Sequence, residues 1–180
     1  MNVVLSGDVL CFCLTSNPRH PILPFGAEDC FWIEMERGKA MKKILVPVDG
    51  SEQSHKAVVF AVDLASHYQA TICLLHVFKL NIIPEGYGEY VVSDRVQLRA
   101  LGDRIVAAAE DEAKGHGVEH IQTAVVEGDP AERIIDYAQE HDVDIIVIGS
   151  RGLGTFKGLL LGSVSNKVTH RADRTCVIVR

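Results

Sequence analysis

Three almost continuous apolar runs constrain the fold of this chain more than any other feature. They cover Thr71–Phe78, Val143–Ile148 and Cys176–Val179. A strand that is apolar on both faces belongs in a parallel sheet that is covered by helices on both sides. Two further strands are expected at Lys43–Val48 and Ile121–Val126. The sequence therefore predicts five strands in a three-layer α/β sandwich.

Helical periodicity fills the intervals between these strands. We expect one helix capped by Ser51, one over residues 92–114, one capped by Asp129 and one over residues 163–171. The segment 81–90, which contains one proline and two glycines, is expected to be a loop. Because helices connect successive strands, the strands run parallel and their carboxyl ends meet at one edge of the sheet. Folds of this kind bind ligands at that edge.

Residues 1–40 lack this regular pattern. They hold three of the six prolines and the only tryptophan, and they lack the basic start of a secretory signal. Because Met41 opens a run typical of a protein start, our hypothesis is that Met41 is the initiator and residues 41–180 are the domain. The alternative is a genuine N-terminal extension, either disordered or folded onto that domain.

Charge, hydropathy and cysteine usage limit the partners and the compartment. The formal charge of −6 argues against a nucleic-acid partner, which would require a basic face. No apolar stretch reaches the roughly 18 residues of a membrane helix, so no membrane partner is expected. Cys73 and Cys176 lie in apolar runs and are expected to be buried. With no C-x-x-C pair, neither a disulfide framework nor a zinc site is expected, and a cytoplasmic location fits.

A glycine-rich segment follows the fourth predicted strand. Its spacing is G-x2-G-x9-G-S, formed by Gly149, Gly152, Gly162 and Ser163. Glycine lets the backbone approach a ligand, and a helix start presents free N–H groups and a positive dipole end. The segment is therefore predicted to hold phosphate, with Ser163 as both helix cap and phosphate ligand and Ser165 as a second hydroxyl. A plain surface loop is the alternative.

Asp49 and Val77 end two other predicted strands and are expected to converge with the glycine-rich segment. Asp49 is either a turn residue or helix cap, or a carboxylate that binds ribose hydroxyls or a metal. We favour the ribose, because a cation site would need further carboxylates grouped with Asp49. Val77 either packs in the core or offers its backbone to an adenine edge. Arg151 and Lys157 are either phosphate-neutralising or simply solvated.

The sequence does not carry a recognisable catalytic motif. It has no G-x4-G-K-[ST] loop, and no G-x-G-x-x-G follows the first strand of the domain. His76 is expected to be a hydrogen-bonded core or rim histidine, and we assign no catalytic residue. Phosphoryl transfer needs a general base or metal-binding carboxylates, and residues 150–161 contain neither Asp nor Glu. Binding is therefore favoured over turnover.

Residues 42–180 resemble the universal stress protein family throughout. The resemblance rests on KILVPVDGS at 43–51, LLHV at 74–77, GDP at 128–130 and DIIVIG at 144–149, and on the complete glycine pattern. The pattern G-x2-G-x9-G-[ST] is typical of the branch that binds ATP. The resemblance implies a five-stranded parallel sheet of the adenine-nucleotide alpha-hydrolase-like kind, which is a flavodoxin- or Rossmann-like open sheet.

The same resemblance implies an adenine-nucleotide site. Asp49 would take the ribose and Val77 would meet adenine through its backbone. ATP is the expected ligand, with or without Mg²⁺ or Mn²⁺. AMP or another adenine nucleotide is the alternative ligand. The implied site consists of Pro47, Val48, Asp49, Val77, Ile148, Gly149, Arg151, Gly152, Gly162, Ser163, Val164 and Ser165.

Three functions are compatible with this resemblance. The first is a nucleotide-binding regulator or sensor of the stress response, the second a weak ATPase or phosphotransferase, and the third a structural dimer without ligand. Family members commonly form homodimers by pairing their last strands antiparallel, which would involve Cys176–Val179 here. One departure concerns Thr175, since many relatives have a proline just before this strand.

Overall fold

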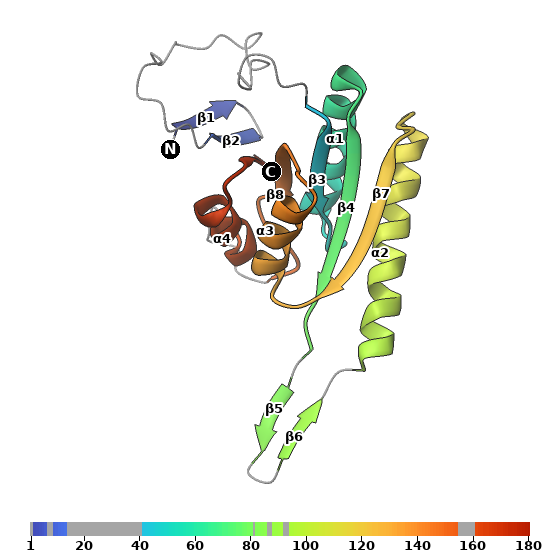
Figure 1. The fold of residues 1–180 in the computed structure, drawn as a ribbon, viewed down its shortest axis with the longest axis vertical. Helices are drawn as coiled ribbons and strands as arrows, with labels where there is room; N and C mark the ends of the chain where they lie inside the picture. Colours follow the sequence, from blue (N-terminus) through green and yellow to red (C-terminus); the bar gives the residue numbers. More distant parts are fainter. Residues whose placement is uncertain are drawn as a thin grey trace.

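The computed structural model describes residues 2–6, 9–13, 41–80, 82–85, 88–91, 94–154 and 161–180. Its centre is a sheet of seven strands in the order β1-β2-β9-β8-β3-β4-β7 (Figure 1). The five predicted strands are all present and mutually parallel, which confirms the predicted sheet. They are β3 (Lys43–Pro47), β4 (Thr71–Phe78), β7 (Ile121–Glu127), β8 (Ile145–Gly149) and β9 (Thr175–Val179).

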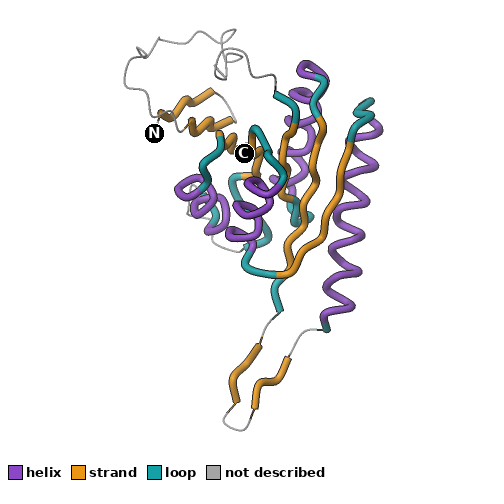
Figure 2. Tube along the Cα trace, in the orientation of Figure 1, coloured by secondary structure: helices purple, strands orange, loops and turns teal. Residues whose placement is uncertain are grey.

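Helices cover both faces of the sheet, as Figure 2 shows. Helices α1 (Glu52–Tyr68) and α2 (Arg95–Gly115) pack on one face, and α3 (Pro130–Glu140) and α4 (Ser163–Arg171) pack on the other. Side chains alternate between the two resulting cores, because successive strand residues point to opposite faces. In β3, for example, Ile44 lies in the core with α1 and Leu45 in the core with α3.

Buried cysteines belong to one of these cores. Cys73 and Cys176 are both almost fully buried among the residues that pack under α3 and α4, as predicted. Burial raises the pKa of the Cys73 thiol, with a smaller opposing effect from Lys43. The thiol is therefore neutral at physiological pH and packs as a small apolar group.

Local capping chemistry sets where three helices begin. The Ser51 hydroxyl accepts from Ser54 N at 3.2 Å, and one Asp129 oxygen accepts from Ala131 N at 3.2 Å, as predicted for these two caps. Helix α2 begins later than expected, because Asp94 caps it and accepts from Val96 N at 2.8 Å. Side-chain acceptors at these positions satisfy helix amides that would otherwise lack a partner.

Two hairpins differ from the sequence prediction. The segment expected to be a loop contains β5 (Ile82–Glu85) and β6 (Gly88–Val91), which pair antiparallel in a separate sheet. Pro84 argued against a strand, but a proline is tolerated where its missing N–H would face solvent at the edge of a sheet. In the N-terminal region, β1 (Asn2–Ser6) and β2 (Val9–Cys13) also form an antiparallel pair.

Strand β2 pairs antiparallel with β9, with Val9 opposite Val179 and Phe12 opposite Cys176. This is the edge of β9 that was expected to pair with a second copy of the chain. In the structure, that edge is occupied by a segment of the same chain (Figure 1).

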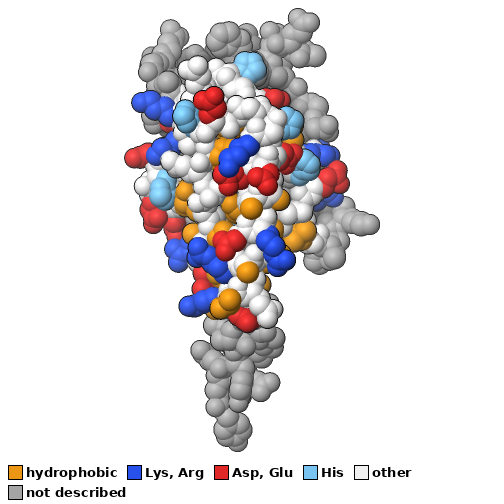
Figure 3. Space-filling view, turned by 90° about the vertical axis from the view of Figure 1, so that its right-hand side faces the viewer, with side chains coloured by type: hydrophobic (Ala, Val, Ile, Leu, Met, Phe, Trp, Pro, Cys, Tyr) orange, Lys and Arg blue, Asp and Glu red, His pale blue; other side chains and the backbone are white. Residues whose placement is uncertain are grey.

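The surface over α2 and β7 mixes charges of both signs, with hydrophobic side chains between them (Figure 3). Within the described ranges, no helix combines the length and the apolar composition needed to span a membrane.

Candidate functional site

A cavity of about 310 Å³ opens at the carboxyl end of the parallel sheet. Its walls come from the ends of β3, β4 and β8 and from the start of α4. Strand β3 lies between β4 and β8, so the chain leaves β3 toward one side of the sheet and later returns to the other. Ligands of open α/β sheets bind at such a switch point.

All twelve residues of the predicted site line this one cavity. They come from three strand ends and one helix start that are far apart in the sequence. They are Pro47, Val48, Asp49, Val77, Ile148, Gly149, Arg151, Gly152, Gly162, Ser163, Val164 and Ser165.

Asp49 connects the end of β3 to the glycine-rich segment. Its Oδ1 accepts from Ser51 N at 2.9 Å, which closes the turn into α1. Its Oδ2 accepts from Leu153 N at 3.2 Å, across 104 residues of sequence. Each carboxylate oxygen can accept more than one hydrogen bond, so both oxygens keep capacity for a further donor. The carboxylate is thus a turn residue and a link to the loop at the same time.

Two glycines of the motif lie close to neighbouring groups of the protein. A Cβ on Gly149 would lie 2.7 Å from the backbone carbon of Gln53, so only glycine lets β8 end this close to α1. A Cβ on Gly152 would overlap Oδ2 of Asp49. The sequence interpretation attributed these glycines to close approach of a ligand; a second reason for glycine is the Gln53 backbone at Gly149, and at Gly152 a side chain would displace the Asp49 carboxylate.

The first turn of α4 lines the cavity. Its N-cap is Gly162, which has no side chain to accept a hydrogen bond from the helix. The first amides of a helix have no intrahelical acceptor, and they carry the positive end of the helix dipole. Ser163 was predicted to be the cap, but it is the first helical residue instead, and its side chain is exposed. The prediction of a serine cap was therefore wrong by one residue.

Ser165 serves the structure of the site. Its buried hydroxyl donates to Gly149 O at 2.7 Å and so fastens α4 to the end of β8. With its hydrogen used in this way, the hydroxyl can offer only its oxygen lone pairs to other groups. It is therefore not a free donor for phosphate.

Helix α3 supplies a wall of the cavity that the sequence reasoning missed. Pro130 and Ile134 face the cavity from this helix. They follow the carboxyl end of β7, which lies at the same edge of the sheet as the other strand ends. Their position after a strand end could therefore have identified them from the sequence. Ser54, Leu75, Leu153, Gly154 and Leu161 also line the cavity.

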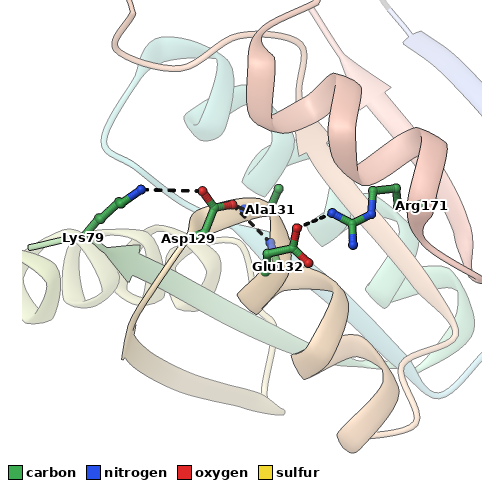
Figure 4. A network of polar contacts seen from close by, with 5 residues as sticks. All are labelled: Lys79, Asp129, Ala131, Glu132 and Arg171. Atoms are coloured by element: carbon green, nitrogen blue, oxygen red, sulfur yellow. Dashed lines mark hydrogen bonds and ion pairs between the residues drawn. The ribbon is translucent and has the colours of Figure 1, made fainter.

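Polar contacts join the start of α3 to neighbouring segments (Figure 4). Asp129 caps the helix, and its other oxygen lies 4.0 Å from the Lys79 ammonium just beyond β4. Glu132 pairs with Arg171 at the end of α4. The Glu132–Arg171 pair thus joins α3 to α4, although an exposed ion pair adds little stability on its own.

Asp49 and Arg151 are the one carboxylate and the one cation among the described residues that line the cavity. No group of three or more His, Cys, Asp or Glu side chains suited to a metal ion is found in the part of the chain that the structure describes. Lys157, the other predicted cation, lies outside the described residues.

Comparisons with known proteins show which family the chain is similar to. The sequence profile of the universal stress protein family matches residues 41–180. "Universal stress protein YxiE" of Bacillus subtilis is 35% identical over 149 residues, with 77% of this chain and 98% of the relative covered.

Solved structures share the fold. "Universal stress protein UspA from Lactobacillus plantarum" superposes with a TM-score of 0.62 at 26% identity, covering 79% of this chain and 99% of that one. A "universal stress protein in complex with cAMP" also gives a TM-score of 0.62, at 28% identity, covering 79% and 98%.

Proposed function

This chain belongs to the universal stress protein family. From that premise we propose that it binds an adenine nucleotide, with ATP as the favoured ligand, and that it acts as a regulator of the stress response. The convergence on one cavity of the twelve residues that the resemblance implies carries the proposal. A solved relative in complex with cAMP supports an adenine nucleotide as the ligand class.

Different walls of the cavity suit different parts of the nucleotide. The uncapped first turn of α4 suits phosphates, because its amides donate and its dipole attracts negative charge. Arg151 at the rim adds a positive charge. Asp49 suits a ribose hydroxyl, since its oxygens still have lone pairs. Val48 and Val77 then remain for the base.

Binding is favoured over turnover by the acid content of the cavity. Asp49 is its one described carboxylate, and this carboxylate is already engaged by two backbone amides. Phosphoryl transfer needs a general base or carboxylates that hold metal ions beside the transferred phosphate. The described residues do not suit a protein-held metal, so Mg²⁺ or Mn²⁺ would be carried by the phosphates and not by a side-chain cluster. A weak ATPase is the second candidate.

A charge change at the start of α4 tests the phosphate assignment. Ser163→Asp puts an anion where phosphate would sit, yet an acid in the first turn of a helix is favourable for folding. We expect the ATP affinity in calorimetry to fall at least about tenfold, equivalent to about 1.4 kcal/mol. The neutral variant Ser163→Asn is the matched control and should stay close to wild type.

The same calorimetry separates the candidate functions. Titrations with ATP, AMP and cyclic AMP show which of these nucleotides the site binds most tightly. Absence of binding for all three would favour the ligand-free structural dimer. Equal ATP affinity in Ser163→Asp and Ser163→Asn would refute the phosphate assignment. Phosphate release above a no-protein control, lost in Asp49→Ala, would support the ATPase.

We also propose that the domain acts in the cytoplasm and forms a homodimer through β9. Strand β9 is apolar and lies at the edge of the parallel strands, where an open ladder favours pairing. Since β2 covers this edge in the full chain, the dimer is expected for a chain that starts at Met41. Light scattering on both forms tests this, and a monomeric chain 41–180 would contradict it.

A further inference from the structure

The ladder between β3 and β4 ends in an unusual way at the cavity. Val48 N donates to Leu75 O at 2.9 Å, which continues the parallel ladder one residue past β3. The carbonyl of the same residue accepts instead from a side chain, His76 Nδ1, at 2.8 Å. A side chain has therefore taken the place of a backbone donor.

The backbone donor expected at this point is Val77. In a strand, successive residues turn their N–H and C=O groups to alternate sides, so Val77 faces the same side as Leu75, which is the side of β3. A continued ladder would join Val77 N–H to the carbonyl of Val48. In the structure that carbonyl accepts from the His76 ring instead, and Val77 is one of the residues that line the cavity.

The position of the His76 ring depends on a glycine in α2. The ring is buried on the face of the sheet that α1 and α2 cover, and 8% of the residue is exposed. A Cβ on Gly102 would lie 2.6 Å from His76 Cδ2 and 2.8 Å from Val125 Cγ1. Since a carbonyl oxygen only accepts, the ring must carry its hydrogen on Nδ1.

We propose that His76 is a positioning residue for the base of the bound nucleotide. Its ring holds the carbonyl of Val48 out of the sheet ladder, so that the N–H and C=O of Val77 stay available to a purine. Adenine presents an adjacent donor and acceptor along one edge, its amino group and a ring nitrogen, and the backbone of a single residue can match both. This inference rests on the proposed nucleotide site and adds the residue that prepares its base end.

Three substitutions at His76 separate this role from simple packing. His76→Phe fills the volume without a donor, His76→Asn places an amide donor near the position of Nδ1, and His76→Gln places one near Nε2. The probes are ATP, which uses both ends of the site, and inorganic tripolyphosphate, which uses only the phosphate end. Calorimetry on the full chain measures both.

We expect His76→Phe and His76→Gln to weaken ATP about tenfold, the value of one buried hydrogen bond, and His76→Asn to restore most of the affinity. Tripolyphosphate should bind equally to all four proteins. Wild-type ATP affinity in His76→Phe, or an equal loss for ATP and tripolyphosphate, would overturn the inference. Failure of the wild-type protein itself to bind ATP would refute the proposed function instead.

A measurement on the wild-type protein covers the case in which the variants do not fold. Adenosine titrated into ¹⁵N-labelled protein should move the amide resonance of Val77, whereas that of Val48, which is bonded within the sheet, should move less. An unmoved Val77 amide in the presence of bound adenosine would overturn the inference.

Discussion

Replacing Gly102 by alanine tests how tightly α2 packs against the His76 ring. Glycine is a poor residue for the middle of a 21-residue helix, and alanine there would normally stabilise the helix. The added methyl group, however, would lie 2.6 Å from His76 Cδ2 and 2.8 Å from Val125 Cγ1. Carbon atoms in contact normally lie about 3.5–4.0 Å apart, so both neighbours must move.

The two effects can be weighed against each other. Overpacking a buried site costs about 1–3 kcal/mol, and two close contacts with buried groups place this site in the upper part of that range. Alanine returns about 1 kcal/mol of helix propensity. We therefore expect Gly102→Ala to lower the free energy of unfolding by about 1–2 kcal/mol, or the melting temperature by about 2–4 °C per kcal/mol.

Gly115 offers a matched control at the end of the same helix. A Cβ there would have no heavy atom within 4 Å, so Gly115→Ala should leave stability unchanged or raise it by up to about 1 kcal/mol. Urea unfolding of both variants measures the difference. A Gly102→Ala protein as stable as Gly115→Ala would refute the close packing of the His76 ring against α2.

Three further predictions concern a hydroxyl, a helix cap and a buried thiol. Ser165→Ala removes the hydrogen bond to Gly149 O, so the free energy of unfolding should fall by about 1 kcal/mol and the ATP affinity should also fall. Urea unfolding and calorimetry measure the two effects. Asp129→Ala removes the cap of α3 and should cost about 1 kcal/mol, while Asp129→Asn should retain most of it, and equal losses would contradict a capping role. Because burial raises the pKa of Cys73, the folded protein holds this proton more tightly than the unfolded chain, so stability should fall as the pH rises above the ordinary cysteine value. Urea unfolding at neutral and alkaline pH measures this, and a slope unchanged in Cys73→Ala would count against it.

The parallel sheet could be predicted because its evidence is local. Runs such as Thr71–Phe78 are apolar on both faces, and such a strand can be satisfied only between two layers of helices. The caps Ser51 and Asp129 bond to amides within four residues, so their roles could also be predicted from the sequence. The hairpins β1–β2 and β5–β6 were missed, because short antiparallel pairs depend on backbone bonds that carry little sequence pattern.

The candidate site could likewise be predicted only in part from the sequence. The motif residues that converge on the cavity were chosen from the sequence, since strand order along the chain places carboxyl ends at one edge of the sheet. The sequence could not say that Asp49 binds Leu153 N, or that His76 takes the carbonyl of Val48. Nor could it say that Gly102 must stay small for the His76 ring.

The sequence by itself therefore determined the layers of the fold, the edge of the sheet at which the cavity opens, and the residue types gathered there. Periodicity, apolar content and motif spacing act between near neighbours in the chain, and they remain visible in one dimension. The tertiary structure alone decided which of these groups are already hydrogen-bonded to the protein and which still face the cavity. Those bonds join segments such as β3 and the glycine-rich loop, 104 residues apart, and their partners are fixed only when helices and sheet pack together.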